Sequence, residues 1–224
     1  MCLLAMWPVA VPAAAPDLLH ARDKQDRATL DRLAAERLDA ARANPNAAAA
    51  QYAAALAQSY VAEVAQELHD KPRATAAADS GIPLAERAVA LQPNSAEYNR
   101  VLGTLCGQAI AGNGLAALKY GKCALTSVNR AVELDPKSSQ AYVSQGVGNF
   151  YLPPAFGGGA DIAIKSFQKA IDLDPRSSDA YVWLGVALHK ANRPADARKA
   201  FDKALELNPE RLWARQQLDK TPAP

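Results

Sequence analysis

Histidine side chains are the first candidates for chemistry in this 224-residue sequence, and there are only three of them. His20, His69 and His189 lie far apart, and none has another histidine or a cysteine three or four residues away. A metal site on one helix would need that spacing. The sequence also lacks the motifs of serine hydrolases, zinc peptidases and nucleotide-binding enzymes. It therefore predicts no metal site, no cofactor and no catalytic residues.

Carboxylates are numerous, but most of them follow the surface pattern of helices, as Asp172, Asp174 and Glu206 do. Such residues usually form a solvated face. An enzyme would need a cleft in which the fold brings distant carboxylates together and shifts their pKa values. Without a motif for such a cleft, the sequence favours a protein that is not an enzyme.

Two cysteines, Cys106 and Cys123, could form a disulfide that closes the segment between them. A third, Cys2, would be lost with an N-terminal leader. Disulfides persist in oxidising compartments. The alternative is a pair of buried thiols, since free cysteine packs as a small apolar residue. Spacing alone does not decide between them, because it does not fix the distance between the Cα atoms.

Residues 1–16 are apolar and uncharged, which indicates a secretory leader ending in small residues near Ala13. The stretch is too short to cross a bilayer, which takes about 20 apolar residues. We therefore expect a periplasmic or secreted protein with no stable membrane span. A disordered apolar tail on a cytoplasmic protein is the alternative.

The net charge is +2, from 25 basic and 23 acidic residues whose signs are interspersed. This pattern gives no electrostatic reason to expect nucleic acid as a partner. Half of the residues are hydrophobic but only 6% are aromatic, and alanine is abundant. Such a composition is typical of closely packed helices rather than of a sheet.

The chain repeats itself. SVNRAVELDPKSSQAYVSQG, residues 127–146, matches SFQKAIDLDPRSSDAYVWLG, residues 166–185, almost position by position. Each copy ends in a proline, and the spacing between these prolines shortens along the chain to 34 residues. That period is typical of helix–turn–helix repeats. The prolines are Pro45, Pro93, Pro136, Pro175 and Pro209.

In its last complete copy the sequence resembles the tetratricopeptide repeat family. The matching residues are Tyr181, Leu184, Gly185, Leu188, Ala197, Phe201, Ala204 and Pro209. The resemblance covers roughly residues 40–218 and weakens before Ala85. It implies an all-α, right-handed α-solenoid over residues 17–219, followed by a tail over residues 220–224. We expect units at 48–93, 96–136, 139–175 and 178–209, and a terminal helix at 210–219.

The residue types have a physical explanation. Gly146 and Gly185 lie in the middle of predicted helices, where glycine costs about 1 kcal/mol relative to alanine. A neighbouring helix that packs against the bare backbone would offset this cost. The residue before each proline is disfavoured in a helix, and serines that follow can cap the next one. The helices should span 17–43, 47–69, 77–91, 95–110, 115–134, 138–151, 160–173, 177–191, 194–207 and 210–219.

The stretch YLPPAFGGGADIAIKSF, residues 151–167, interrupts the helical pattern with two prolines and three glycines. We interpret it as a long turn inside one hairpin, with Phe156 tucked onto the helices because large aromatic side chains usually bury most of their area. A phosphate site is not expected, since no lysine and serine pair of the nucleotide-binding type follows the glycines. This loop also gives a looser similarity to the T-component of periplasmic TRAP transporters and to the microtubule-dynamics regulator group.

The surface expected to carry function is the concave face formed by the first helix of each hairpin. We predict a largely apolar groove that binds a segment of a partner protein, although some of its valines could instead pack between repeats. The alternative is a transport accessory protein with a small apolar ligand in a closed cavity. Partner identity and oligomeric state stay open. The groove residues are Tyr52, Leu56, Arg100, Thr104, Val143, Val147, Phe150, Val182, Val186 and His189.

Overall fold

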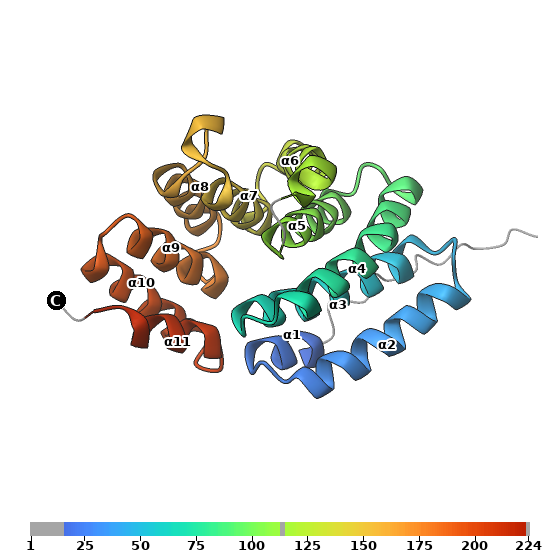
Figure 1. Ribbon diagram of the computed structural model, residues 1–224, viewed down its shortest axis with the longest axis horizontal. Helices are drawn as coiled ribbons and strands as arrows, with labels where there is room; N and C mark the ends of the chain where they lie inside the picture. The colour runs from blue at the N-terminus through green and yellow to red at the C-terminus, as the bar shows by residue number, and fades with distance from the viewer. Residues whose placement is uncertain (1–15, 113–114, 223–224) are drawn as a thin grey trace, which may run out of the picture.

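The computed structural model describes residues 16–112 and 115–222, and this part of the chain is all-α, without a strand (Figure 1). The helices are α1 (Pro16–Asp23), α2 (Arg27–Ala43), α3 (Ala48–Glu67), α4 (Lys71–Leu91), α5 (Ala96–Gly112), α6 (Ala116–Leu134), α7 (Ser139–Tyr151), α8 (Ala160–Leu173), α9 (Ser178–Lys190), α10 (Pro194–Leu207) and α11 (Leu212–Lys220), with a 3₁₀ turn η1 (Pro154–Phe156) between α7 and α8.

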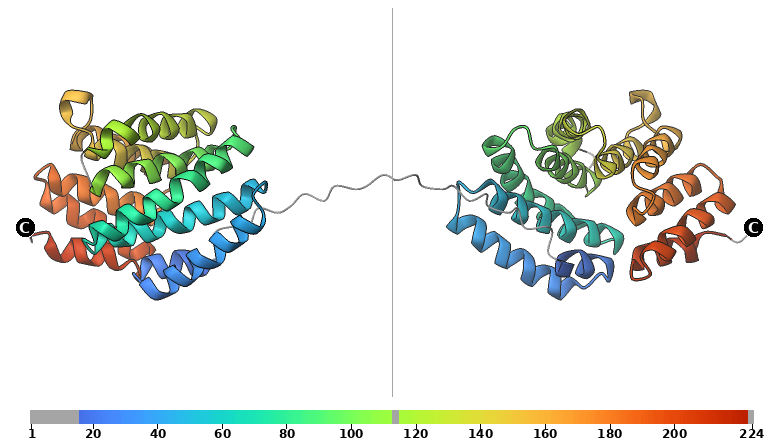
Figure 2. Two further views of the ribbon diagram at one scale, coloured as in Figure 1. Left: turned by 45° about the vertical axis from the view of Figure 1, so that its right-hand side comes forward. Right: turned by 180° about the vertical axis from the view of Figure 1, so that it is seen from behind.

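The helices pair as antiparallel hairpins that follow one another in a curve, as Figures 1 and 2 show. Consecutive partners pack closely in α3/α4, α5/α6, α7/α8 and α9/α10. The first helices of successive hairpins, α3, α5, α7 and α9, also contact one another along the inside of the curve. The chain is therefore an α-solenoid whose inner layer consists of these first helices and whose outer layer consists of α4, α6, α8 and α10.

The prolines end the outer helices as expected. Asp135 and Asp174 occupy the C-terminal caps of α6 and α8, each directly before a proline. The side chain of Ser138 then accepts a hydrogen bond from the backbone NH of Ala141 and so caps α7. Ser177 caps α9 in the same way. Each cap satisfies one backbone NH that the first helical turn leaves without an acceptor.

The single helix expected over residues 17–43 is wrong, because the chain breaks at Gln25. This residue has a positive φ of 52°, and the backbone NH of Asp26 bonds to the carbonyl oxygen of Ala21. The turn closes α1, and Asp26 then caps α2. His69 and Asn192 adopt the same left-handed conformation after α3 and α9. Glycine usually marks this position, so the three turns carry no clear sequence signal.

α4 begins at Lys71, six residues before the expected start at residue 77. Asp70 accepts a hydrogen bond from the backbone NH of Arg73 and so caps the helix. Pro72 lies in the first turn, where its missing NH costs nothing. The early start lengthens the outer helix of this hairpin to 21 residues.

Mid-helix glycines allow neighbouring helices to approach. A Cβ atom added at Gly146 would clash with the ring of Phe167, and one added at Gly185 would clash with the ring of Phe201. Both rings are completely buried. A neighbouring helix therefore packs on the bare backbone in both units, as expected, and the residue in contact is a phenylalanine from the second helix of the same hairpin.

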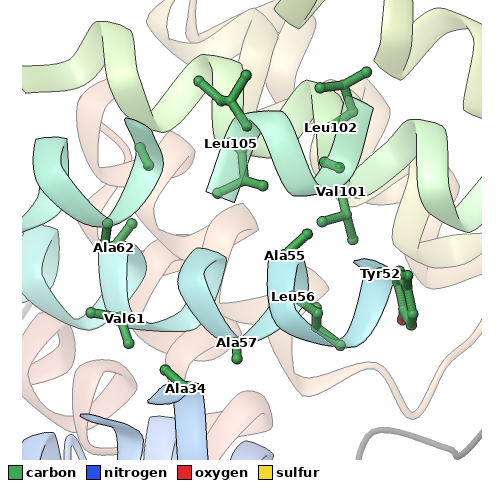
Figure 3. Packing of buried hydrophobic residues seen from close by; sticks show 14 of the residues in the cluster. Ala34, Tyr52, Ala55, Leu56, Ala57, Val61, Ala62, Val101, Leu102 and Leu105 are labelled. Carbon is green, nitrogen blue, oxygen red and sulfur yellow. The ribbon is translucent and has the colours of Figure 1, made fainter. Parts of the chain in front are cut away.

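Buried apolar residues form two core clusters. The first extends from Leu18 in α1 to Ala109 in α5, and the second from Val143 in α7 to Ala214 in α11. Figure 3 shows the first cluster, in which the small side chain of Ala55 on α3 faces Val101 on α5. Alanine at such positions brings helix backbones close together. The two clusters account for most of the packing within each half of the solenoid.

The loop between α7 and α8 differs from the expectation in one respect: Phe156 is 76% exposed rather than tucked. The loop folds on itself, because the backbone NH of Gly159 bonds to the carbonyl oxygen of Asn149 and that of Gly158 to Pro153. Gly157 and Gly159 have positive φ values of 84° and 109°, which favour glycine. The folded loop holds Phe156 away from the helices.

The leader expected over residues 1–16 lies outside the described residues except for Pro16, which begins α1. In the predicted tail, Lys220 ends α11 and Thr221 is buried. The guanidinium of Arg198 donates to the carbonyl oxygens of Leu218 and Thr221 and holds this segment in place. Among the helices described, none combines the length and apolar character needed to span a bilayer.

Candidate functional site: a charged closure and an aromatic face

The inside of the solenoid is closed at one point by charged residues from both ends of the chain. We call this group the charged cluster; it consists of Arg22, Asp23, Glu63, Glu67, Asp179 and Arg211. Helices α1 and α3 supply the first four residues, whereas α9 and the turn before α11 supply the last two. The curve in Figure 1 brings these helices together.

Arg22 forms the first bridge of the charged cluster. Its Nη1 donates to Oδ2 of Asp179 at 2.8 Å, and its Nε donates to Oδ1 of Asp23 at 2.9 Å. The guanidinium also lies 5.4 Å from the ring centre of Tyr60, within the range of a cation–π contact. The buried neighbours Leu18 and Ala21 pack α1 into the first core cluster, and this packing places Arg22 inside the curve.

Arg211 forms the second bridge and is only 1% exposed. Its Nη2 donates to Oε1 of Glu63 at 2.7 Å, and its Nη1 donates to Oε2 of Glu67 at 3.2 Å. The amide of Asn208 adds a bond of 2.7 Å to Oδ2 of Asp23. At this place the C-terminal hairpin therefore contacts α1 and α3 through hydrogen-bonded charges.

The electrostatics of the charged cluster set Glu63 apart. Burial raises the pKa of Glu63 to about 7, because desolvation of its carboxylate outweighs the attraction of Arg22 and Arg211, and Glu67 and Asp179 add repulsion. For Asp179 the balance is the opposite. Burial raises the pKa of its carboxyl, but the attraction of Arg22 and Arg211 is stronger and holds this pKa below its usual value. The charged cluster therefore contains one carboxylate that titrates near neutral pH.

Carboxylates with separated pKa values are also the pattern of acid–base catalysis. In the charged cluster, however, Asp179, Glu63 and Glu67 are all hydrogen-bonded to an arginine. An open surface depression of about 500 Å³ lies elsewhere, between α5 and α6, and none of these carboxylates lines it. The residues that line it are Asn99, Thr126, Ser127, Asn129, Arg130 and Glu133. We therefore interpret the charged cluster as a closure of the curve.

A second polar network lies on the inner face of α3 and α5. The hydroxyl of Tyr52 donates to Oε1 of Glu97 at 2.9 Å, and Arg100 donates to both oxygens of the same carboxylate. Tyr98 stacks on Tyr52 with ring centres 4.9 Å apart. Burial and the neighbouring carboxylate both raise the pKa of Tyr52 above its usual value. This part of the inner face is thus polar and already hydrogen-bonded.

The predicted groove residues separate into three groups. Five of them are less than a tenth exposed and serve packing: Tyr52, Leu56, Val143, Phe150 and Val182. The positions of Tyr52 and Leu56 within the first core cluster are visible in Figure 3. Four are partly exposed: Arg100, Thr104, Val147 and Val186. His189 is exposed, and its Nδ1 lies 3.2 Å from Oγ1 of Thr221.

Aromatic residues from α7, α9 and α11 gather in the C-terminal half, and among them Trp183 and Trp213 were not singled out from the sequence. We call Phe150, Tyr151, Trp183 and Trp213 the aromatic face. The ring centres of Trp183 and Trp213 are 4.9 Å apart, and those of Tyr151 and Trp183 are 6.4 Å apart. Tyr151 is 60% exposed, whereas both tryptophans are partly exposed. No sequence pattern marks Trp183 or Trp213, because each is the single tryptophan of its helix. The aromatic residues meet only when α7, α9 and α11 pack together.

Two cations accompany the aromatic face. The Nζ atom of Lys190 lies 4.5 Å from the ring centre of Phe150. The guanidinium of Arg211 lies 5.4 Å from the ring centre of Trp213. Arg211 therefore connects the aromatic face to the charged cluster, while Lys190 is exposed at its other side.

Cys106 and Cys123 are joined by a disulfide, with their Cα atoms 6.0 Å apart. The bond connects α5 to α6 within one hairpin. Among the described residues, no three His, Cys, Asp or Glu side chains are grouped so that they could hold a metal ion.

Comparison with known proteins agrees with this geometry. Residues 157–211 match the family model described as "Tetratricopeptide repeat". Residues 157–211 therefore carry the tetratricopeptide repeat pattern, and the described chain as a whole has the fold of a solenoid of such helix–turn–helix repeats. The thermophilic TPR protein TTC0263 of Thermus thermophilus superposes with a TM-score of 0.62 at 18% identity, over 93% of this chain and 98% of that one.

The solenoid is also similar to the HusA haemophore of Porphyromonas gingivalis, with a TM-score of 0.54 and 19% identity over 90% of this chain and 96% of the other. A comparison with the curated proteins gives no match. At these identities the likeness concerns the fold, and residue roles must be argued from this chain alone.

Proposed function

We propose that this tetratricopeptide repeat solenoid is a non-catalytic scaffold that binds a segment of a partner protein on its aromatic face. The observation that carries the proposal is the continuous contact of Tyr151, Trp183 and Trp213 across α7, α9 and α11, with Tyr151 60% exposed. Tyrosine and tryptophan are the residues most enriched where protein interfaces gain their energy.

The rest of the inner face supports this choice. Its N-terminal half is occupied by the Tyr52, Glu97 and Arg100 network, and the charged cluster closes the curve. The aromatic face lies on the opposite half, where Lys190 offers a cation next to apolar rings. This combination suits a short apolar segment with an acidic residue beside it.

The transport alternative required a closed apolar cavity lined by Tyr52, Val143 and Val182. All three side chains are packed at less than a tenth exposure. The geometry of these residues therefore favours the scaffold over a carrier of a small apolar ligand.

Capture of partners by the immobilised chain tests the proposal. We expect the double variant Tyr151→Ala/Lys190→Ala to lose the proteins that the native chain retains. The control is Tyr120→Ala, which removes an aromatic residue from the outer helix α6. The same set of captured proteins for the native chain and the double variant would contradict a role of the aromatic face.

We further propose that the protein works in an oxidising compartment. The Cys106–Cys123 disulfide and the apolar stretch of residues 1–16 both favour export. Mass spectrometry of the protein recovered from the cell envelope tests this: we expect a chain that begins near residue 16. An intact Met1 would contradict processing at this site.

A further inference from the structure

The outer helix α6 turns leucines toward solvent. Leu118 is 89% exposed and Leu125 is 55% exposed. They lie seven residues, about two helical turns, apart and therefore share one face of the helix. The buried residues of α6, Ser127, Val128 and Ala131, all belong to its C-terminal half. The N-terminal half thus places large apolar side chains outside the core.

The loop between α7 and α8 adds a second apolar projection. Phe156 is 76% exposed at its tip, and residues 151–160 contain no charged side chain. The backbone hydrogen bonds from Gly158 to Pro153 and from Gly159 to Asn149 hold the loop in one shape. The exposed Phe156 therefore lies on a folded turn and not on an extended segment.

The two elements that carry these side chains lie on the same side of the molecule. In Figure 1 and in both views of Figure 2, α6 and the loop after α7 lie along the upper edge. These views are related by rotation about the vertical axis, so the shared edge does not come from overlap in one projection. We call Leu118, Leu125 and Phe156 the apolar edge.

The elements that carry the apolar edge contain more basic than acidic residues. Residues 101–132 contain Lys119, Lys122 and Arg130 but no Asp or Glu. From the start of α6 to the end of α8, residues 116–173 contain six Lys or Arg and four Asp or Glu, so this segment has a net charge of +2, equal to that of the whole chain. Asp79 and Glu86 of α4 lie beside Lys119, so Lys122 of α6 and Lys165 of α8, both exposed, are the principal cations.

We propose that the apolar edge docks the protein on the surface of an anionic membrane. Leu118, Leu125 and Phe156 would enter the boundary between headgroups and acyl chains, which interfacial helices reach with such residues. Lysines beside them would contact anionic headgroups while their carbon chains remain in the apolar layer.

A bilayer fits these observations better than a folded partner does. The apolar side chains project from two separate elements on the outer edge, and a lipid surface can deform around both. A protein partner would need matching hollows at each of them. This docking surface is separate from the aromatic face, so the partner proposed above and the membrane do not compete for the same residues.

Co-sedimentation with lipid vesicles tests the proposal. We expect the native chain to bind vesicles of mixed phosphatidylglycerol and phosphatidylcholine, and to bind vesicles of phosphatidylcholine alone far more weakly. Binding should weaken as salt is raised, because the lysines contribute through screened charge. The double variant Leu118→Gln/Leu125→Gln should reduce the binding constant by about tenfold or more, since each leucine contributes through its buried area.

Two further variants complete the experiment. Phe156→Ser changes a different element and should also weaken binding, whereas Leu212→Gln, at an exposed leucine of α11, should leave it unchanged. Circular dichroism should show native helix content in all of them, because the altered side chains are exposed.

Three results would overturn the proposal. One is failure of the native chain to sediment with the anionic vesicles, and another is equal binding by Leu118→Gln/Leu125→Gln and Leu212→Gln. The third is a native dimer in light scattering that the double leucine variant converts to a monomer while vesicle binding is unchanged. That result would assign the apolar edge to a second copy of the chain.

Discussion

Arg22 and Asp179 lie 157 positions apart in the sequence, yet Nη1 of Arg22 donates to Oδ2 of Asp179 at 2.8 Å. This hydrogen bond joins the first helix of the described chain to α9, and so joins the two core clusters across the inside of the curve. Arg211 makes the second connection, to Glu63 and Glu67. The solenoid is therefore closed by charges rather than left open at its ends.

Removal of Arg22 should destabilise the fold. In Arg22→Met, Asp179 and Glu63 lose a buried cation, and breaking one partner of a buried pair costs roughly 3–5 kcal/mol. We expect the free energy of unfolding, measured with urea, to fall by about that amount. The control Arg32→Met removes an exposed arginine that pairs with Glu36 four residues along α2, and it should change stability by less than about 1 kcal/mol. Equal effects of the two substitutions would contradict the closure.

The closure should also respond to pH through Glu63. Its pKa is raised from the ordinary value of 4.5 to about 7, so the folded state binds a proton that the unfolded chain releases. The resulting stabilisation is present below pH 4.5 and is lost as pH rises toward and through 7. We expect the free energy of unfolding to decrease by a few kcal/mol between about pH 5 and pH 8.

Glu63→Gln isolates that contribution. The amide cannot titrate but keeps the shape of the side chain, so the decrease between about pH 5 and pH 8 should become much smaller. The pKa of Asp179 is lowered, so its contribution to the free energy of unfolding has the opposite pH dependence. That contribution is lost as the pH falls into the acid range. A native protein that gains stability over the same pH range would rule out the raised pKa of Glu63.

Local sequence signals predicted the C-terminal half well. The prolines after Asp174 and Asn208 act within a few residues, so α8 and α10 end where they were expected to end. The break at Gln25 was missed, because a non-glycine residue in a left-handed turn has no distinct signature. The charged cluster could not be predicted either: Arg22, Asp179 and Arg211 look like surface residues until the curvature brings the ends of the chain together.

Two glycines of α7 provide a matched test of the packing. Alanine at Gly146 would place its Cβ against the buried ring of Phe167, whereas Gly148 has no atom within 4 Å of that position. We expect Gly146→Ala to destabilise by about 1–3 kcal/mol, as overpacking does, despite its better helix propensity. Gly148→Ala should stabilise by up to about 1 kcal/mol. Thermal unfolding followed by circular dichroism measures both, and a stabilising Gly146→Ala would show that α7 and α8 are not in close contact.

The disulfide between α5 and α6 should contribute to stability through the chain that it closes. Cys106 and Cys123 are 17 residues apart, and closing a loop of that length restricts the unfolded state by about 3 kcal/mol. We expect a reductant to lower the free energy of unfolding in urea by about that amount. The control Cys106→Ala/Cys123→Ala should be indifferent to the reductant, because it has no bond to lose. If the reductant leaves the native protein unchanged under conditions that reduce the bond, α5 and α6 are held together by packing alone, with no contribution from the covalent link.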